Sequence, residues 1–363
     1  MLSSPPTQQK SLKIQLKTNK MDTKIVRIND TTEYSEALKT AAQIILAGGL
    51  VVFPTETVYG LGGNGLLADA AKKIYAAKGR PSDNPLIIHI SSPDEAEKYA
   101  NTSEIYYRLA QAFMPGPLTV IMPKKDCIPL SVTGGLETVA VRCPSHKIAH
   151  ELIKECGVPI AAPSANISGR PSPTSAEYVI EDMDGRVDMI IDGGECEIGL
   201  ESTIVKVDGN SLTLLRPGGI TYDALCCVCD DVKIAPAVLE KLAENEKPLS
   251  PGMKYRHYAP SADFVLLDGK DSDVLSFMQA EQKNNCAVLC YDEEFSSLDP
   301  SLTICIGAKN DLNTQAKKLF TSLREADKLG AKKIYAHLPQ LDGLGLALYN
   351  RMIRAAAHTI KKV

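Results

Sequence analysis

Tryptophan is absent from this chain of 363 residues, and phenylalanine occurs only six times. Apolar residues still make up 44% of the sequence, which is enough for two cores, and we expect aliphatic side chains to pack them. The sequence also lacks any run of about 18 uncharged apolar residues, so no membrane span is expected.

The first 20 residues contain four lysines but no acidic residue, no arginine and no long apolar segment. Without an apolar segment they do not resemble a secretory signal, and without arginine they differ from a transit peptide. We therefore expect residues 1–24 to form a disordered tail.

Acidic residues slightly outnumber basic ones, and the formal net charge is −4. A protein that coats nucleic acid without sequence preference is usually strongly basic, so this total argues against that class. A basic pocket confined to one site remains compatible with the total.

Ten cysteines occur, and the densest group is Cys-Cys-Val-Cys at 226–229. The sequence has no second cysteine pair at the spacing of a zinc ribbon and no histidine at the spacing of a zinc finger. The other seven cysteines lie in apolar stretches, which is typical of buried, reduced thiols. We therefore expect no protein-held metal and a cytoplasmic location.

Apolar runs alternate with amphipathic segments from residue 33 to about residue 219, as in α/β folds. The pattern predicts helices at 34–46, 68–77, 93–100, 103–113, 147–156 and 175–183. It predicts strands at 50–53, 86–90, 118–122, 138–142, 159–162, 189–192, 202–207 and 212–215. Asp208-Gly209-Asn210 predicts a hairpin turn between the last two strands.

A second alternation follows Pro260 and predicts a small parallel sheet covered by helices. Its expected strands are 264–267, 287–290, 303–306 and 333–337, and its expected helices are 274–283, 314–328 and 344–360. Between the two alternations, residues 248–260 are rich in proline, aromatic and basic residues, unlike a flexible spacer. We expect this segment to pack against another part of the protein.

Two polar segments each combine glycine, proline, a cation and small hydroxyl or amide side chains in one turn. They are residues 78–86, KGRPSDNPL, and residues 163–172, PSANISGRPS. Glycine lets a backbone approach a ligand, proline restricts φ, and the cation supplies charge. A lone Lys78-Gly79-Arg80 is also compatible with a solvated helix end, but two such loops favour one site for a highly charged ligand.

Residues 60–65, Gly-Leu-Gly-Gly-Asn-Gly, match the pattern G-x-G-x-x-G. A dinucleotide site requires a strand directly before this pattern and a helix that opens within it. Residues 54–59 intervene here and the next helix begins later, so we do not expect a Rossmann cofactor. A Walker A loop is also lacking in the sequence.

Arg142 and Arg216 each follow an apolar strand. Because burying an unpaired charge is costly, each is expected to be paired or to face a ligand. His89 is also compatible with a satisfied core histidine, and Glu201-Ser202 with a strand cap. Cations and hydroxyl groups without an evident protein nucleophile favour phosphate binding and electrostatic stabilisation of phosphoryl or nucleotidyl transfer.

Several longer motifs resemble the YrdC/Sua5 family. They are PTETVYGL at 54–61, the 78–86 loop, PSANISG at 163–169, ESTIV at 201–205 and LRPG at 215–218. Residues 250–260, SPGMKYRHYAP, resemble the linker of the long Sua5 form. The resemblance extends from about residue 25 to the end of the chain.

The resemblance implies an α/β fold in two parts. Residues 25–220 would form a YrdC-like catalytic domain, with a twisted, open, mixed sheet flanked by helices. Residues 221–260 would form a linker or lid, and residues 261–363 a smaller, Rossmann-like α/β domain.

The resemblance also implies threonylcarbamoyl-AMP synthase activity. L-Threonine, ATP and bicarbonate or CO2 would give L-threonylcarbamoyladenylate and pyrophosphate, the first step of tRNA t6A37 modification. A downstream t6A transferase complex would be a partner, and a weak contact with tRNA is compatible with this role.

The resemblance and the chemistry of the residues together suggest roles for individual site residues, which are hypotheses. Those expected to bind ATP are Lys78, Arg80, Asn84, Thr138, Ser164, Asn166, Ser172, Arg216, Tyr255 and Tyr258, and Lys78, Arg80, Ser164 and Asn166 are also expected to be catalytic. Those expected to bind threonine are Thr57, His89, Arg142, the backbone of Ala162, and Ser202. Mg2+ would be held mainly by the ATP phosphates, and Tyr255 or Tyr258 would fold over the pocket as part of a lid.

Three other classes are compatible with parts of the sequence. An RNA-binding module is disfavoured by the net charge and by the lack of a series of base-stacking aromatic residues. A hydrogenase-maturation carbamoyltransferase has a similar domain but also paired C-x-x-C segments, which this sequence lacks. A noncatalytic nucleotide-binding regulator would show no threonine-dependent consumption of ATP.

Overall fold

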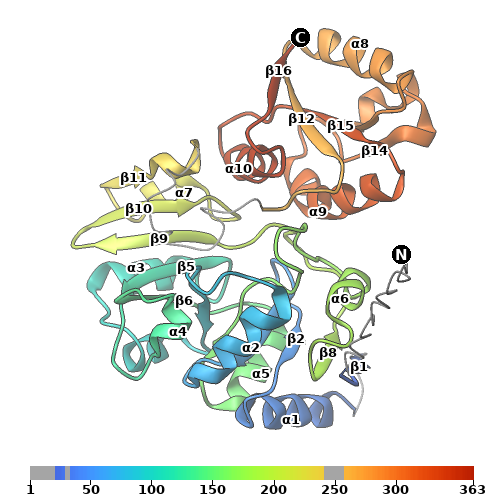
Figure 1. Cartoon of the computed structure of the whole chain (residues 1–363). Coiled ribbons are helices and arrows are strands. Elements are labelled where there is room, and N and C mark those ends of the chain that lie inside the picture. Colours follow the sequence, from blue (N-terminus) through green and yellow to red (C-terminus); the bar gives the residue numbers. More distant parts are fainter. Residues whose placement is uncertain (1–20, 29–32, 241–256) are drawn as a thin grey trace, which may run out of the picture.

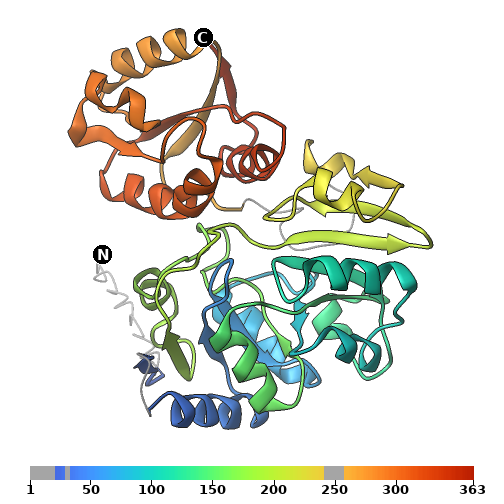
Figure 2. The same cartoon turned by 180° about the vertical axis from the view of Figure 1, so that it is seen from behind.

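The computed structural model describes residues 21–28, 33–240 and 257–363. These residues form a larger N-terminal and a smaller C-terminal α/β domain, which lie one above the other in Figures 1 and 2. The two-part α/β fold expected from the sequence is confirmed.

The N-terminal domain is built on a mixed sheet that has eleven strands among the described residues. In the order in which they lie, the strands are β1 (Lys24–Arg27), β8 (Met189–Asp192), β2 (Val51–Phe53), β3 (Gly60–Asn64), β7 (Ile160–Ala161), β4 (Ile87–His89), β6 (Thr138–Arg142), β5 (Leu118–Pro123), β9 (Thr203–Asp208), β10 (Ser211–Arg216) and β11 (Val232–Ile234). The predicted hairpin turn joins β9 to β10, which are antiparallel.

Helices cover both faces of this sheet because the central strands are apolar on both sides. Val51 and Phe53 pack with the side chains of α1 (Glu33–Leu46) and α5 (Lys147–Cys156), whereas Val52 packs into the core on the other face. Successive strand residues point to opposite faces, which explains this division. The second face is covered by α2 (Ala68–Lys78), α3 (Glu104–Phe113), α4 (Leu130–Thr133), α6 (Ala176–Met183) and α7 (Tyr222–Cys226).

Strand β3 was not predicted, because its glycine-rich sequence resembles a loop. A Cβ atom on Gly62 would lie 2.6 Å from the ring of Phe53 and 2.7 Å from the side chain of Ile160. Glycine at this position therefore allows close packing inside the sheet.

Described structure extends beyond both predicted limits of the catalytic domain. At the N-terminal side, the backbone N–H of Met21 donates to the carbonyl of Gly185, and β1 pairs with β8. At the C-terminal side, α7 is followed by β11, which pairs in parallel with β10, and by the short 3-10 helix η2 (Pro236–Val238). Thus part of the segment expected as a tail or linker is joined to the first sheet.

The C-terminal domain contains a parallel sheet, as predicted. Its strands lie in the order β14 (Thr303–Cys305), β13 (Ala287–Cys290), β15 (Lys333–His337), β12 (Asp263–Asp268) and β16 (Ile360–Lys362). Helices α9 (Leu312–Lys328) and α10 (Gly345–Ala355) pack on one face and α8 (Asp271–Gln282) on the other. Short 3-10 helices η3 (Asp292–Ser297) and η4 (Pro300–Leu302) connect β13 to β14.

Two predicted helices differ from the structure. The helix predicted at 344–360 ends at Ala355, because Ala357 and His358 adopt positive φ angles of 48° and 64° before β16 begins. The helix predicted at 93–100 is a 3-10 helix, η1 (Pro93–Lys98).

The two domains meet through α9 and α10, which lie on the side of the C-terminal domain that faces the N-terminal domain (Figure 1). The Arg324 guanidinium of α9 donates to the Asp182 carboxylate of α6 at 2.7 Å, and both side chains are buried. Asn350 of α10 donates to the carbonyl of Val238 at 2.7 Å. Buried polar contacts of this kind require a defined arrangement of the domains.

All ten cysteines are free thiols, and six of them are buried. Cys127 is exposed, as are Cys226 and Cys227. Burial was expected for the seven cysteines outside the 226–229 group, and this expectation is wrong for Cys127. In the part of the chain that the structure describes, every helix is too short or too polar to cross a bilayer.

Candidate functional site

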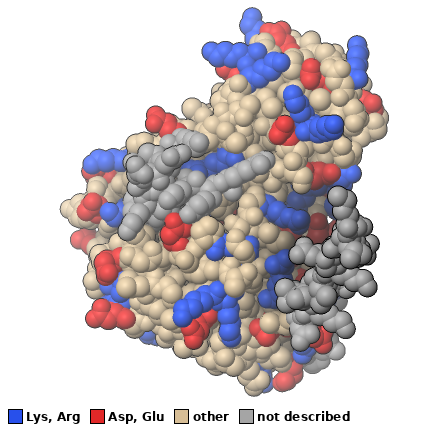
Figure 3. Space-filling view, viewed as in Figure 1, with Lys and Arg blue, Asp and Glu red and all other residues tan. Residues whose placement is uncertain are grey.

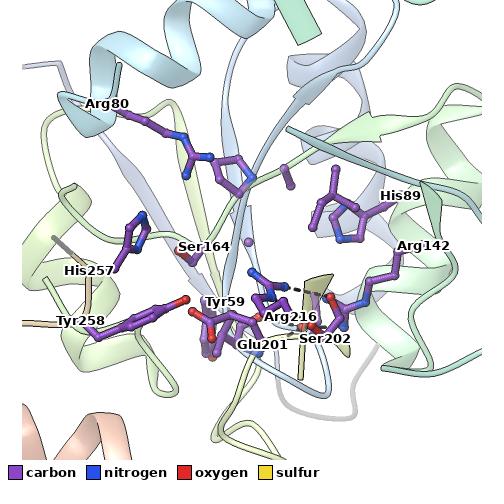
Figure 4. Close-up of a pocket in the computed structure, with 16 residues that line it drawn as sticks. Tyr59, Arg80, His89, Arg142, Ser164, Glu201, Ser202, Arg216, His257 and Tyr258 are labelled. Carbon is purple, nitrogen blue, oxygen red and sulfur yellow. Dashed lines mark hydrogen bonds between the residues drawn. The ribbon is translucent and has the colours of Figure 1, made fainter. Parts of the chain in front are cut away.

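A small cavity of about 40 Å³ lies beside the central strands of the N-terminal sheet, next to residues 257–258 at the end of the linker (Figure 4). Its walls come from the strand ends, from the 163–172 loop and from residues 257–258. The lining residues are Thr55, Val58, Tyr59, Gly60, Arg80, Ile87, His89, Arg142, Ala162, Pro163, Ser164, Glu201, Ser202, Arg216, His257 and Tyr258.

His89 and Arg142 lie side by side because they end two neighbouring parallel strands. Strands β4 and β6 pair so that the Cα of His89 is opposite that of Arg142. The carboxyl ends of parallel strands are where α/β proteins commonly bind ligands. In Figure 4 both side chains approach the cavity from the same side.

Arg142 is paired with an acidic residue that the sequence analysis did not single out. Its Nη2 donates to Glu56 Oε1 at 2.7 Å and to Thr57 Oγ1 at 2.9 Å. Nε of Arg142 and Oε2 of Glu56 are buried and have no hydrogen-bond partner among the described residues. Arg142 thus combines a fixed position with an unused donor.

His89 is a neutral imidazole at ordinary pH. Burial, together with the nearby Arg142 charge, lowers the pKa of His89 to about 3. Its Nδ1 lies 3.3 Å from the carbonyl oxygen of Ile160. Because a carbonyl oxygen can only accept, a hydrogen bond at this position requires the proton on Nδ1, and that tautomer leaves Nε2 as an acceptor.

Lys78 joins the two polar loops that the sequence singled out. Helix α2 ends at Lys78, and Gly79 caps it in the left-handed region at φ 62°. The ammonium nitrogen of Lys78 donates to the carbonyls of Ser164 and Asn166, both at 2.5 Å. Burial and the nearby Arg80 charge lower the pKa of Lys78 well below its usual value.

Arg80 begins the next turn and points into the cavity (Figure 4). Its Nη2 donates to the carbonyls of Asn84 and Pro85 at 3.3 and 3.1 Å, while its Nε is buried without a partner among the described residues. Burial lowers the pKa of Arg80 to about 10, so the guanidinium remains charged at neutral pH. Asn84 Oδ1 is likewise buried and unpartnered among the described residues.

Ser202 and Arg216 lie together at the ends of neighbouring strands. Arg216 donates from Nη2 to Ser202 Oγ and from Nε to the Ser202 carbonyl, both at 3.1 Å. The Ser202 hydroxyl also lies 2.8 Å from that of Thr119. Arg216 therefore brings a third guanidinium to the cavity without being paired to an acid within salt-bridge distance among the described residues.

His257 and Tyr258 close one side of the cavity (Figure 4). Tyr258 is buried at a positive φ of 62° and stacks on Phe320 of α9, with 5.1 Å between the ring centroids. Burial and the neighbouring Arg80 charge lower the pKa of His257 to about 3, so its imidazole is neutral. The end of the linker is thus held between the cavity and the C-terminal domain.

Comparison with known proteins matches both domains. The Sua5, YciO and YrdC family profile, described as telomere recombination, matches residues 43–218, and a threonylcarbamoyl-AMP synthase C-terminal domain matches residues 220–357. The threonylcarbamoyl-AMP synthase of Pyrococcus abyssi is 44% identical over 334 residues, which cover 90% of this chain and 96% of that protein. The chain belongs to the Sua5 family.

Two further Sua5 relatives support this placement. The threonylcarbamoyl-AMP synthase of Bacillus subtilis is 43% identical over 320 residues, which cover 87% of this chain and 92% of that protein. The crystal structure of Pyrococcus abyssi Sua5 complexed with L-threonine matches with a TM-score of 0.85 and 42% identity, over 94% of this chain and all of that one. The resemblance predicted from the motifs is confirmed.

The Sua5 fold brings most of the predicted residues to one place. Eight line the cavity directly: Arg80, His89, Arg142, Ala162, Ser164, Ser202, Arg216 and Tyr258. Five others lie buried behind the lining or one contact away from it: Thr57, Lys78, Asn84, Asn166 and Ser172.

One predicted residue, Thr138, lies away from the cavity. Thr138 begins β6, at the opposite end from Arg142, which is about 13 Å away along an extended strand. It is half-buried and outside the cavity lining. Tyr255 lies outside the described residues.

Sequence reasoning missed Glu56, Glu201 and His257 as site residues. Glu56 and Glu201 belong to the motifs PTETVYGL and ESTIV, but they were expected neither to pair with a site arginine nor to line a cavity. A buried carboxylate needs a cation beside it. In the sequence, the arginines at strand ends were the only indication that buried acid–arginine pairs would form. No group of acidic, histidine and cysteine side chains suited to a metal ion occurs in residues 21–28, 33–240 and 257–363.

Proposed function

We propose that this protein is a threonylcarbamoyl-AMP synthase, which converts ATP, L-threonine and bicarbonate or CO2 into L-threonylcarbamoyladenylate and pyrophosphate. One observation carries the proposal. Three buried guanidinium groups, Arg80, Arg142 and Arg216, converge on one cavity together with neutral hydrogen-bonding groups. Two anionic substrates require such a concentration of positive charge, and the Sua5 relatives bear the name of this activity.

The threonine end of the cavity is the His89 and Arg142 side. The free Nε donor of Arg142 and the Ser202 hydroxyl suit a carboxylate, and the unprotonated Nε2 of His89 accepts a hydrogen bond from the threonine hydroxyl or amine. Thr57 holds the Arg142 guanidinium in place, and the backbone of Ala162 completes the wall. The similarity to Pyrococcus abyssi Sua5, whose crystal structure is complexed with L-threonine, supports a threonine site in this fold.

The nucleotide end is the opposite side, where the two polar loops meet. Arg80 and Arg216 would neutralise phosphate oxygens. Lys78 would hold the turn that contains Ser164 and Asn166 in its conformation. Asn84 and Ser172 supply further polar groups next to them. Mg2+ fits this role as an ion carried by the ATP phosphates.

The reaction needs no protein nucleophile. The threonine amine attacks the carbon of CO2, or of bicarbonate with loss of hydroxide, and the amine proton is released to give a carbamate. A carbamate oxygen then attacks the α-phosphorus of ATP, and the bond to the β-phosphate oxygen breaks to release pyrophosphate. The arginines contribute by aligning the carbamate with the α-phosphate and by neutralising charge on the departing pyrophosphate.

Residues 257–258 would have to move during each cycle. A volume of about 40 Å³ holds only a few water molecules, so a nucleotide cannot enter the cavity with His257 and Tyr258 in these positions. We infer that the linker acts as a lid, as its sequence suggested. Closure over the substrates would exclude water from the carbamate and the adenylate.

The product would be handed to a t6A transferase that acts on tRNA. Basic and acidic side chains are interspersed over most of the face in Figure 3, which disfavours RNA binding as the principal function. A weak and salt-dependent contact with tRNA, and a cytoplasmic location, are compatible with the proposed role.

Mass spectrometry tests the activity directly. The protein is mixed with ATP, Mg2+, L-threonine and bicarbonate, and the products are searched for threonylcarbamoyl-AMP and pyrophosphate. Both should appear, and both should be missing when threonine is omitted. ATP consumption that does not depend on threonine would contradict the proposal and favour a nucleotide-binding regulator. Tight tRNA binding without adenylate formation would favour the RNA-binding class.

A further inference from the structure

Arg351 of the C-terminal domain reaches the wall of the cavity. It lies in α10 and its side chain is completely buried. Its Nε donates to Glu201 Oε2 at 2.8 Å, and Glu201 is one of the lining residues. The Arg351 guanidinium also lies 5.6 Å from the ring centroid of Tyr258. Arg351, which is 150 positions from Glu201 in the sequence, therefore contacts the wall of the cavity.

Glu201 connects Arg351 to Ser172, which lies on the nucleotide side of the cavity. Its second oxygen, Oε1, accepts a hydrogen bond from the Ser172 hydroxyl at 2.6 Å. Desolvation opposes its ionisation, but the charges of Arg351 and Arg216 lower the pKa of Glu201 to about 2. The carboxylate is therefore charged at neutral pH and holds Ser172 by a charge-assisted hydrogen bond.

The same carboxylate influences Arg216. Two cations act on Glu201, yet only Arg351 lies within salt-bridge distance among the described residues. Arg216 instead donates to the Ser202 hydroxyl and carbonyl. Because Arg351 neutralises Glu201, the Arg216 charge stays free for an anionic ligand.

A second arginine of the C-terminal domain holds the neighbouring residue. Arg324 of α9 donates to the carbonyl of Pro171 at 2.6 Å, directly before Ser172, as well as to Asp182. Helix α9 thus contacts the end of the 163–172 loop directly through Arg324, whereas α10 acts on it through Arg351 and Glu201. The position of the Ser172 hydroxyl depends on the C-terminal domain at both points.

We propose that Arg351 is a positioning residue for the adenylation reaction and that through it the C-terminal domain completes the active site. Arg351 acts through Glu201: it fixes the Ser172 hydroxyl and keeps Arg216 available to the ATP phosphates. The inference rests on the proposed function in assigning ATP to this cavity. It gives the C-terminal domain a role in catalysis beyond covering the site.

If Arg351 acts in this way, replacing Glu201 as well should restore the ATP affinity that an Arg351 variant loses. In Arg351→Met, the buried Glu201 carboxylate loses its partner, and Arg216 becomes the nearest cation that can neutralise it. Arg216 then leaves Ser202, and ATP loses a charge-assisted contact that is worth about tenfold to 100-fold in affinity. In the double variant Arg351→Met/Glu201→Gln the competing charge is gone, so Arg216 returns to the ligand.

The test compares the full-length wild type, Arg351→Met, Glu201→Gln and the double variant. ATP binding is followed by calorimetry, and threonine-dependent pyrophosphate release gives KM and kcat. Lys317→Gln is the control, because it removes the Lys317–Glu195 pair across the domain interface without touching the cavity. Thermal unfolding of every variant reports on folding.

We expect Arg351→Met to bind ATP at least about tenfold more weakly, and the double variant to regain most of this loss. Unchanged ATP binding in Arg351→Met would overturn the proposal, as would a double variant as weak as the single one, because a purely structural role allows no rescue by removing Glu201. A wild type that makes no adenylate but shows the loss and rescue of ATP binding would refute the proposed function and leave the positioning role in place. A wild type that does not bind ATP would refute both.

Discussion

The ammonium nitrogen of Lys78 lies 2.5 Å from the carbonyl oxygen of Asn166 and 3.3 Å from the Oδ1 of the same residue. The two polar loops recognised in the sequence are therefore one structural unit. A further hydrogen bond joins the two loops, in which the backbone N–H of Ser168 donates to the carbonyl of Lys78 at 2.9 Å. Lys78, which is expected to touch ATP directly, is thus also the link between the two polar loops.

Replacing Lys78 should damage both stability and turnover. In Lys78→Met, the buried Asn166 carbonyl and the partly buried Ser164 carbonyl lose their donor, and an unsatisfied buried group costs about 1–3 kcal/mol. Threonine-dependent pyrophosphate release should fall by about 100-fold as the loop loses its shape. Lys72→Met is the matched control, because Lys72 lies on the same helix but is exposed and pairs with Asp69 at the surface. Equal melting temperatures for the two variants would contradict this link.

Arg142→Gln should act mainly on threonine. Its KM for threonine is expected to rise by at least about tenfold, while its KM for ATP changes much less, because a charge-assisted contact to one substrate is lost. The variant also leaves Glu56 buried without its cation, which costs about 3–5 kcal/mol of stability.

The double variant Arg142→Gln/Glu56→Gln separates these two effects. It should recover most of the melting temperature but none of the threonine affinity. Recovery of both would mean that Arg142 acts only by neutralising Glu56. Steady-state kinetics and thermal unfolding of the three proteins provide the comparison.

The neutral state of His257 predicts a pH-dependent weakening of the linker contact. The pKa of His257 is about 3 in the folded protein against an ordinary value of 6.5, so the exposed form binds a proton first as the pH falls. The stability that buried His257 contributes is complete above about pH 6.5 and is lost progressively between about pH 6.5 and pH 3. Hydrogen exchange or limited proteolysis near residues 257–260 should increase over this range, and His257→Gln should flatten the dependence. An identical pH profile in His257→Gln would exclude His257 as its cause.

Gly62→Ala should destabilise the protein in the absence of any ligand. The added methyl would meet the Phe53 ring at 2.6 Å, and such overpacking typically costs about 1–3 kcal/mol. Gly219→Ala is the control, since its Cβ would have ordinary contacts beginning at 3.4 Å. Chemical denaturation of both variants checks this, and a Gly62→Ala protein as stable as Gly219→Ala would argue against the packing role.

The positions of several candidate site residues were predictable because they follow from local rules. Arg142 and Arg216 end apolar strands, and strand ends in an α/β sheet meet at one edge. Lys78 and Arg80 flank Gly79, whose left-handed conformation ends the helix and lets both side chains turn inward. These positions follow from short-range backbone preferences and from the alternation of apolar residues.

Other residues could not be predicted, because their partners are distant in the chain. Glu201 was equally compatible with a strand cap, and nothing in its neighbourhood points to Arg351. Thr138 lies in the same strand as Arg142 but about 13 Å from it at the other end, so its expected contact with the nucleotide stays a prediction. Strand β3 was missed because glycine has a low strand propensity, which its packing against Phe53 overrides.

The sequence alone determined the two α/β domains, the two polar loops and the family, because each depends on residue order over short stretches. The tertiary structure was needed to show that Glu56 neutralises Arg142, that Lys78 ties the loops together and that Arg351 crosses the domain interface to Glu201. The physical reason is that a buried charge must find a partner in space, and that partner is chosen by how the domains pack and not by its place in the chain.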